Sequence, residues 1–201
     1  MNFIKIDIKD KEYPEKLKYI KDPPNQLFAI GNYSLLNEYS ISVIGSRCCS
    51  EYGKNITKKI VTELALRDIC IVSGMAIGID TIAHTSTLDV SGKTIAVLGS
   101  GFNKLYPKEN IKLFNRIIEN NGLVVSEYEP NIEPCSKNFP KRNRIVSGLS
   151  LGVLVIEAMY RSGTSITANI AVKQGKKVMC IPRDLESKNG VGTNNLIKKR
   201  S

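Results

Sequence analysis

Short apolar runs alternate with longer amphipathic stretches over most of the chain. Six of the apolar runs predict β-strands, at residues 41–45, 69–74, 94–99, 123–127, 153–158 and 177–182. Helical periodicity predicts helices between several of them, at residues 51–68, 79–92, 109–122 and 164–176. Regular alternation of strand and helix is typical of an α/β fold with right-handed crossovers. We therefore predict a doubly wound, mostly parallel sheet with helices on both faces.

The first 40 residues have a different texture. They are polar and are interrupted by Pro14 and by the pair Pro23 and Pro24, which favour short helical turns and extended chain. Such a segment cannot form a hydrophobic core alone. We therefore divide the chain into a lead-in segment, residues 1–40, and a core domain, residues 41–201.

Composition narrows the class of protein. With 201 residues and 42% hydrophobic side chains, the chain fits one globular domain rather than a disordered or fibrous protein. A formal net charge of +10 favours a polyanionic partner such as nucleic acid, because neutralised phosphates release condensed counterions. Lysine-rich amino-acid usage produces the same charge, so charge alone does not identify the partner.

Cysteine spacing argues against metal and disulfide chemistry. The five cysteines are odd in number, have no CxxC spacing and lie near no histidine cluster. We expect reduced thiols in a cytoplasmic protein, and no metal site. The N-terminus carries lysines and aspartates where a signal peptide needs an apolar stretch, and no window reaches the length of a membrane span. No membrane association is expected.

Small and cationic residues follow the predicted strands, where a parallel sheet binds ligands. Gly45, Ser46 and Arg47 end the first strand, and Ser73 and Gly74 end the second. These turns offer backbone amides, hydroxyls and a guanidinium to an anion. The first turn has one glycine rather than GxGxxG, so a dinucleotide site is poorly supported and no cofactor is predicted. The alternative is a structural strand-to-helix turn with a solvated arginine.

The third and fifth strands end in similar turns. Gly101 and Lys104 follow the third strand, and Ser162 and Gly163 follow the fifth, next to Arg161. Backbone amides at the start of the next helix favour an anion. For the third strand, a plain glycine turn is an equally good interpretation. Together the turns place cations around one edge of one sheet, which is a stronger indication than any single turn.

A basic cluster stands ahead of an apolar run in the segment NFPKRNRIVSGLS, residues 138–150. Pro140 biases Phe139 toward extended backbone, with its ring free to stack on an unpaired base. The cluster then supplies Lys141, Arg142, Asn143 and Arg144. Cations at a helix N-terminus oppose the helix dipole, so a negative group must offset them. Glu127 or Glu157 would do so structurally, and a phosphodiester would do so functionally.

Two titratable residues near these turns have simpler interpretations. His84 is the only histidine and has no evident catalytic partner, so we expect a packed or capping side chain. Asp80 stands near the start of a predicted helix, and a helix cap is favoured over a chemical role.

The order of these motifs resembles the DNA-processing protein A family, also called DprA or Smf. The likeness runs through YPEKLKYIKDPPNQLFAIGN, SVIGSR, SGMAIGIDTIAH, TIAVLGSGFNKLYP, VVSEY, FPKRNRIVSGLS, VIEAMYRSGTSITA and GTNNLI. It implies a Rossmann-like core that binds single-stranded DNA, usually as a homodimer, and helps load RecA recombinase during natural transformation. It also implies that the DNA pocket is lined by Arg47, Ser73, Gly74, Phe139, Lys141, Arg142 and Arg144.

We therefore expect a non-enzymatic protein that binds and protects incoming single-stranded DNA, with no cofactor and no catalytic residue. The predicted DNA-binding residues are Ser46, Arg47, Ser73, Gly74, Gly101, Lys104, Phe139, Lys141, Arg142, Asn143, Arg144, Ser162 and Gly163.

The sequence departs from the family toward its C-terminal end. Where members have proline and glycine after the sixth strand, this chain has Arg183 and Asp184, and its last residues are KKRS. Many members also carry an N-terminal helical domain and a C-terminal winged helix, for which these residues have no room. Partner and dimer contacts in the family lie partly toward the C-terminal region, so dimerisation and recombinase loading rest on less of the chain than DNA binding does.

Two other functions stay open. An enzyme of the cytokinin-activating phosphoribohydrolase type would use the segment SGTSIT as a phosphate turn and Glu127 or Glu157 as its carboxylate. The double-glycine form of that motif is absent from this sequence. A nucleotide-sensing or defence module of the same fold would bind a free nucleotide without turnover.

Overall fold

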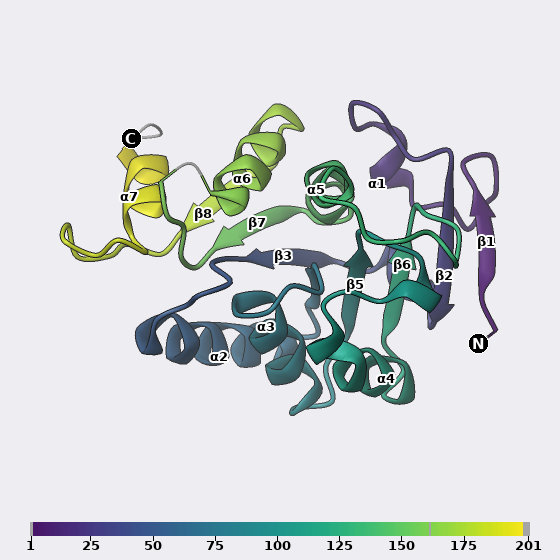
Figure 1. The fold of residues 1–201 in the computed structure, drawn as a ribbon, viewed down its shortest axis with the longest axis horizontal. Helices are drawn as coiled ribbons and strands as arrows, with labels where there is room; N and C mark the ends of the chain where they lie inside the picture. The colour runs from purple at the N-terminus through teal and green to yellow at the C-terminus, as the bar shows by residue number, and fades with distance from the viewer. Residues whose placement is uncertain (1, 161, 199–201) are drawn as a thin grey trace.

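The computed structural model describes residues 2–160 and 162–198, which form one eight-stranded sheet in the order β1-β2-β6-β5-β4-β3-β7-β8 (Figure 1). The strands are β1 Ile4–Asp7, β2 Gln26–Gly31, β3 Ser40–Ile44, β4 Cys70–Ser73, β5 Thr94–Leu98, β6 Leu123–Ser126, β7 Gly152–Val155 and β8 Lys177–Cys180. The α-helices are α1 Glu15–Lys18, α2 Glu51–Leu66, α3 Ile79–Leu88, α4 Ile111–Glu119, α5 Asn138–Gly148, α6 Gly163–Lys173 and α7 Val191–Lys198. Short 3₁₀ turns are η1 Tyr33–Asn37, η2 Phe102–Lys104 and η3 Lys108–Asn110.

Six neighbouring strands, in the sheet order β6-β5-β4-β3-β7-β8, form the parallel part of the sheet. They coincide with the six predicted apolar runs, although β7 ends at Val155 rather than at residue 158. Strands β4 to β7 are buried at every residue, which is why their sequences read as continuous apolar runs. The predicted doubly wound, mostly parallel α/β fold is confirmed.

Helices cover both faces of the sheet. In Figure 1, α2, α3 and α4 lie on one side, and α1, α5 and α6 lie on the other. The two layers bury separate hydrophobic clusters, with Leu17 and Ile145 in one and Ala83 and Phe114 on the opposite face. Each large apolar side chain that is fully buried contributes about 1.5–3 kcal/mol.

The first 40 residues contribute two antiparallel strands that the sequence pattern does not predict. Strand β1 pairs with β2, and β2 pairs with β6, so this segment extends the main sheet. Its side chains Ile6, Leu27 and Leu36 join the core that packs under α5. Both strands are short and are bounded by polar residues and prolines, so the sequence pattern gives no clear strand signal. Their apolar side chains are recognised as core residues only because they pack into the shared core.

Helix α5 begins earlier than the sequence predicts. Its first residue is Asn138, so Phe139 is helical and the predicted extended backbone at Phe139 is wrong. Pro140 is the third residue of this helix, where its missing N–H costs no intrahelical bond. The helix can therefore start on a proline-containing turn.

The chain changes direction across the sheet between β3 and β7. Strands β3, β4, β5 and β6 succeed one another toward one edge, whereas β7 pairs with the other side of β3 and β8 follows it. Sheets of this kind bind ligands beyond the carboxyl ends of the strands, at this switch point. The segments after β3, β4 and β7 are therefore where a functional site is expected.

Candidate functional site

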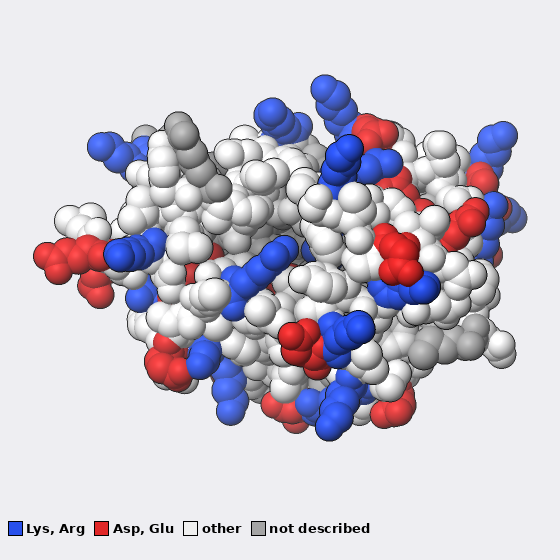
Figure 2. All heavy atoms as spheres, viewed as in Figure 1, with Lys and Arg blue, Asp and Glu red and all other residues white. Residues whose placement is uncertain are grey.

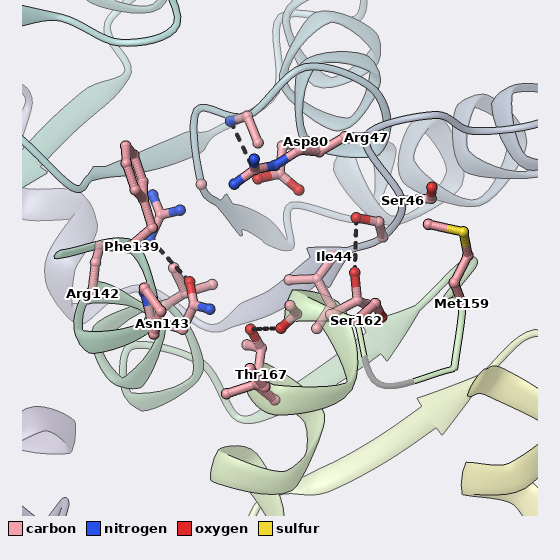
Figure 3. Close-up of a pocket in the computed structure, with 18 of the residues that line it drawn as sticks. Ile44, Ser46, Arg47, Asp80, Phe139, Arg142, Asn143, Met159, Ser162 and Thr167 are labelled. Atoms are coloured by element: carbon pink, nitrogen blue, oxygen red, sulfur yellow. Dashed lines mark hydrogen bonds between the residues drawn. The ribbon is translucent and has the colours of Figure 1, made fainter. Parts of the chain in front are cut away.

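A cavity of about 810 Å³ opens at the switch point (Figure 3). Its walls come from the turn after β3, the start of α3, one face of α5 and the N-terminal end of α6. The volume lies in the range of sites for organic ligands. Eight predicted DNA-binding residues line the cavity, namely Ser46, Arg47, Gly74, Phe139, Arg142, Asn143, Ser162 and Gly163.

One end of the cavity presents the start of α6. The Ser162 hydroxyl caps this helix by accepting from the Ser165 amide at 3.3 Å, and Thr164 Oγ1 donates to the Gly45 carbonyl at 3.0 Å. Apart from its chain neighbours and the backbone of its own helix, no described atom lies within 4 Å of where a Cβ at Gly163 would stand, so the first helical residue is open to the cavity. Amides at a helix N-terminus and the positive end of its dipole favour an anion.

The turn after β3 carries Arg47 to the cavity wall. The Ile79 amide donates to the Ser46 carbonyl at 3.2 Å and holds this turn against the start of α3. Gly78 has a φ of 85°, and a Cβ there would lie 2.4 Å from the Ser46 carbonyl oxygen, so only glycine permits this approach. Arg47 itself is exposed, and no ion pair joins it to a carboxylate within the described part of the chain.

An aromatic pair forms the other end of the cavity. The rings of Phe139 and Tyr106 lie 5.6 Å apart at an angle of 54°, and both side chains line the cavity. A Cβ at Gly99 would lie 2.8 Å from Phe139 Cδ1, so glycine makes room for this ring. Sequence reasoning missed Tyr106 as a lining residue, because its aromatic partner becomes its neighbour only in the folded chain.

Arg142 is held inside the cavity wall rather than extended into solvent. Its Nη1 donates to the Val97 carbonyl at the end of β5, and its Nε donates to Asn143 Oδ1 at 3.2 Å. Burial lowers the pKa of the guanidinium, and the nearby carboxylate of Asp80 opposes that effect. Arg142 therefore supplies a fixed positive charge to the cavity.

Asp80 also lines the cavity and is 8% exposed. The N-cap of α3 is Gly78, and Asp80 Oδ2 accepts from the Ala76 amide at 3.4 Å, outside the helix. The predicted helix-cap role is therefore wrong. Burial raises the pKa of this carboxyl from 3.8 to about 6, although Arg142 holds it lower than burial alone would.

His84 lies behind the cavity wall and is fully buried. Its Nε2 lies 2.6 Å from the Gly74 carbonyl oxygen, and its Nδ1 lies 2.7 Å from Thr94 Oγ1. Burial lowers its pKa to about 4, so the ring is neutral at pH 7. The predicted packed histidine is confirmed.

Five predicted DNA-binding residues do not line the cavity, and the structure gives each another environment. Arg144 Nη2 bonds Glu127 Oε1 at 2.6 Å, and Lys141 Nζ lies 3.6 Å from the same oxygen. Lys104 pairs with Glu133 at 2.7 Å.

The other two are packed against backbone. Ser73 Oγ donates to the Val43 carbonyl at 2.6 Å, and a Cβ at Gly101 would lie 2.2 Å from the Glu129 carbonyl oxygen. The fifth-strand cation Arg161 lies outside the described residues.

The two carboxylates proposed for an enzyme are turned away from the cavity. Glu127 pairs with Arg144. Glu157 is fully buried, accepts from the Ser50 amide at 2.9 Å and from the Ser50 hydroxyl at 2.5 Å, and pairs with Arg183. Neither carboxylate reaches a ligand in the cavity.

On the face shown in Figure 2, positive charge is spread over several places rather than gathered in one patch. Lysines and arginines stand along the outline of this face and also near its centre, interspersed with acidic side chains, and a hollow opens near the centre. Arg47 and Arg142 line the cavity, so the positive charge at the site comes from these two residues rather than from a broad basic patch on this face.

The structure adds three observations on classes considered from the sequence. Within residues 2–160 and 162–198, no helix is both long and apolar enough to cross a bilayer. In the same residues, no group of three or more His, Cys, Asp or Glu is arranged to hold a metal ion. All five cysteines are free thiols.

A doubly wound, mostly parallel sheet with a cavity and an arginine at its switch point defines a Rossmann-like fold with a candidate ligand site. Comparison of the sequence narrows this class to one family. The chain belongs to the DNA recombination-mediator protein A family, whose sequence model matches residues 5–201. The resemblance of its motifs to that family is thereby confirmed.

Several relatives share most of this chain. It is 41% identical over 187 residues to protein Smf of Escherichia coli, covering 93% of this chain and 50% of that protein. It is 43% identical over 197 residues to the DNA processing protein DprA of Streptococcus pneumoniae, covering 98% and 69%. For DprA of Bacillus subtilis the identity is 40% over 181 residues, covering 90% and 61%. The chain thus spans about half to two thirds of these relatives.

Solved structures show the same fold. The crystal structure of DprA from Streptococcus pneumoniae matches with a TM-score of 0.94 and 41% identity, over all of this chain and 70% of that one. DNA processing protein A from Helicobacter pylori, studied for its single-stranded DNA binding mode, matches with a TM-score of 0.89 and 32% identity, over 99% and 88%. A molybdenum cofactor binding protein from Rippkaea orientalis, 17% identical with a TM-score of 0.54 over 81% and 97%, shares the fold alone.

Proposed function

We propose that this protein binds single-stranded DNA in the cavity at the switch point and acts in DNA processing during transformation or recombination. The observation that carries the proposal is the pairing, in one cavity, of an open helix N-terminus and Arg47 with the aromatic rings of Phe139 and Tyr106. The Helicobacter pylori relative, whose structure concerns single-stranded DNA binding, supports it.

Binding would follow from the two ends of the cavity. Phosphates would settle on the amides at the start of α6 and on Arg47, which gives an affinity that falls as salt rises. An unpaired base would stack on Phe139, and a duplex would first have to release that base from its stack. The site therefore favours single strands over duplex DNA.

We propose that the protein acts without bond making. Glu127 and Glu157 are occupied by arginines, so the carboxylates expected for a phosphoribohydrolase do not reach the cavity. The carboxylate at the cavity wall is that of Asp80, at the start of α3. It lies beside Arg142 of α5.

A competition experiment separates the candidate functions. Labelled single-stranded oligonucleotide would be bound by the protein and displaced with unlabelled single strands, duplex DNA or nucleoside monophosphates. Single strands should displace it best. Displacement by a monophosphate together with its hydrolysis would favour the enzyme, and saturable nucleotide binding without strand binding would favour the sensor.

The proposal extends to partners and location. We propose that the protein protects incoming DNA, helps load RecA recombinase and self-associates as a homodimer in the cytoplasm. The family to which the chain belongs supports this extension. Sedimentation velocity of the chain tests the dimer, and RecA-dependent strand exchange on protein-coated DNA tests the loading.

Arg47→Ala should weaken binding of all single-stranded sequences alike, by on the order of tenfold, because Arg47 would contact phosphate rather than a base. The slope of log affinity against log salt should decrease by about one for the lost phosphate contact. Fluorescence anisotropy across a salt series measures both quantities. Arg67→Ala is the matched control, because Arg67 is an exposed arginine whose partner is Glu63. A changed base preference in Arg47→Ala would contradict the assigned role.

Phe139→Ala should cost about 1–3 kcal/mol of binding free energy, since one base would lose its stacking partner. The same anisotropy assay on a single strand of mixed sequence measures the loss. Tyr39→Ala removes an aromatic ring that is 73% exposed and does not line the cavity, so it should bind like the wild type. Unchanged affinity of Phe139→Ala would remove this ring from the site.

A further inference from the structure

Asp80 places an ionisable carboxylate in a cavity that otherwise suits anions. It lies in the first turn of α3 and lines the cavity, yet it is more than nine-tenths buried. Its hydrogen bond from the Ala76 amide is long, at 3.4 Å. The charge of Arg142 and the Ser73 hydroxyl also act on this carboxylate and lower its pKa. A carboxylate accepts from several donors, so a ligand that donates could add to these interactions.

A phosphate would not supply those donors, because it would be repelled by the carboxylate. The anion-binding end of the cavity lies instead at the start of α6, where Ser162 and Gly163 present the helix N-terminus. In Figure 3, Phe139 and Ser162 lie on opposite sides of the view, with Asp80 above the space between them. A nucleotide with its phosphate at α6 would therefore direct its base toward Asp80 and Phe139.

Asp80 and Arg142 flank Gly74 and face the same small space. A Cβ at Gly74 would lie 2.5 Å from Asp80 Oδ2 and 2.7 Å from Arg142 Nη2, so only glycine lets both side chains pack against this residue. The cavity thus presents an acceptor and a donor side by side. On nucleobases, the Watson–Crick edge of guanine is the complement, because its amino group and N1–H donate and its O6 accepts.

We propose that Asp80, next to Arg142, reads the Watson–Crick edge of one base held in the cavity and favours guanine over thymine. The inference rests on the proposed function, since it concerns a base of the bound single strand. Thymine offers one N–H between two carbonyl oxygens, and those oxygens would face the carboxylate. A site built to bond a donor discriminates against a ligand that lacks it.

The test uses three oligonucleotides of abasic residues that carry one central base: guanine, hypoxanthine or thymine. Hypoxanthine keeps N1–H and O6 of guanine but lacks its amino group. The wild type should bind the guanine strand about tenfold more tightly than the thymine strand, as one bidentate base contact allows. The hypoxanthine strand should fall between them.

Asp80→Asn should reduce the guanine-to-thymine ratio to within about twofold of one, because the amide keeps a single acceptor oxygen. Asp89→Asn makes the same change at the other end of α3, where Asp89 pairs with Arg116, and should keep the wild-type ratio. Circular dichroism shows whether Asp80→Asn is folded.

A pH series on the wild type tests the same point without a variant. The charged groups that act on Asp80 are Arg142 from α5 and Arg47 from the turn after β3, and the nearest histidine, His84, bonds the Gly74 carbonyl. The arginines keep their charge, and the pKa of His84 is lowered to about 4, whereas the pKa of Asp80 is about 6. The guanine-to-thymine ratio should therefore fall as the pH drops from 7 to 5.

The outcomes are distinct. Failure of the wild type to bind any of the three strands would overturn the proposed function and this inference with it. Equal affinity for the three strands at pH 7 would overturn the inference alone. A guanine preference that Asp80→Asn retains, or that does not change between pH 7 and 5, would assign the preference to other groups.

Discussion

Arg183→Ala is expected to lower the free energy of unfolding by about 3–5 kcal/mol, because it leaves a buried carboxylate without its charge partner. The Glu157 side chain is fully buried, and the Arg183 side chain is 10% exposed. The guanidinium also lies 4.4 Å from the centre of the Tyr52 ring and donates to Ser50 Oγ at 3.0 Å. Equilibrium denaturation in urea, with the slope compared between variants, measures the change.

The double variant Glu157→Gln with Arg183→Ala should recover most of that loss. A neutral amide keeps the shape of Glu157 against Gly53 but carries no charge that needs a partner. Arg67→Ala, which breaks an exposed pair with Glu63, should change stability by less than about 1 kcal/mol. An Arg183→Ala protein as stable as this control would show that Glu157 finds other compensation.

This ion pair also links the segment after β8 to the rest of the core. Arg183 extends from the segment after β8 to Ser50, the N-cap of α2, and to Glu157, which follows β7. The Arg183 amide and carbonyl both bond the side chain of Asn194, at 3.0 and 2.9 Å, in α7. The backbone of Arg183 thus anchors α7 to the segment after β8, and its side chain pairs with Glu157.

Arg144→Ala is expected to lower the free energy of unfolding by about 3 kcal/mol and to leave DNA affinity of the folded protein within about twofold of wild type. Arg144 is buried and bonds Glu127 through both terminal nitrogens, at 2.6 and 3.1 Å. Its Nε also donates to the Asp22 carbonyl at 2.7 Å, which ties the first 40 residues to α5. Glu127 keeps some exposure and the nearby Lys141, which places the loss at the lower end for buried pairs.

Thermal or urea unfolding and anisotropy on the same preparation separate the two effects. Arg47→Ala provides the opposite pattern, with weaker binding and unchanged stability. If Arg144→Ala lost DNA binding while keeping its stability, Arg144 would belong to the binding site rather than to the fold.

The parallel strands could be predicted from the sequence because helices bury both of their faces. Strand β5, for example, is buried at all five residues and reads as an uninterrupted apolar run. Strand β1 has the burial pattern of a partly exposed edge, with Ile4 exposed and Ile6 buried, so its short sequence carries little signal. Edge strands of this kind become evident only through their pairing.

The sequence predicts that the basic cluster is important. It does not show which residues of the cluster line the cavity, because that depends on where α5 begins. Phe139, Arg142, Asn143 and Val146 share one helix face, at spacings of three, four and seven residues, and all line the cavity. Arg144 follows Arg142 by two residues, which turns its side chain by about 200° and toward Glu127. Once a helix is assumed to begin at residue 138, the same sequence predicts this division.

Asp80 and Tyr106 show what local sequence cannot supply. Asp80 lies two residues after Gly78, which has a positive φ, and in sequence it resembles a helix cap. Its environment is nevertheless set by Arg142, which is 62 positions later in the chain. Tyr106 meets Phe139 only because the segments after β5 and β6 converge. Both depend on contacts between distant parts of the chain.

Photocrosslinking tests the central claim, that single-stranded DNA binds in the cavity at the switch point. A strand carrying 5-iodo-2′-deoxyuridine would be irradiated with the protein, and the modified peptide identified by mass spectrometry. The account predicts crosslinks at Phe139 or Tyr106, with a yield that falls in Arg47→Ala. Crosslinks confined to residues outside the cavity, such as those of β1 and β2, would contradict it.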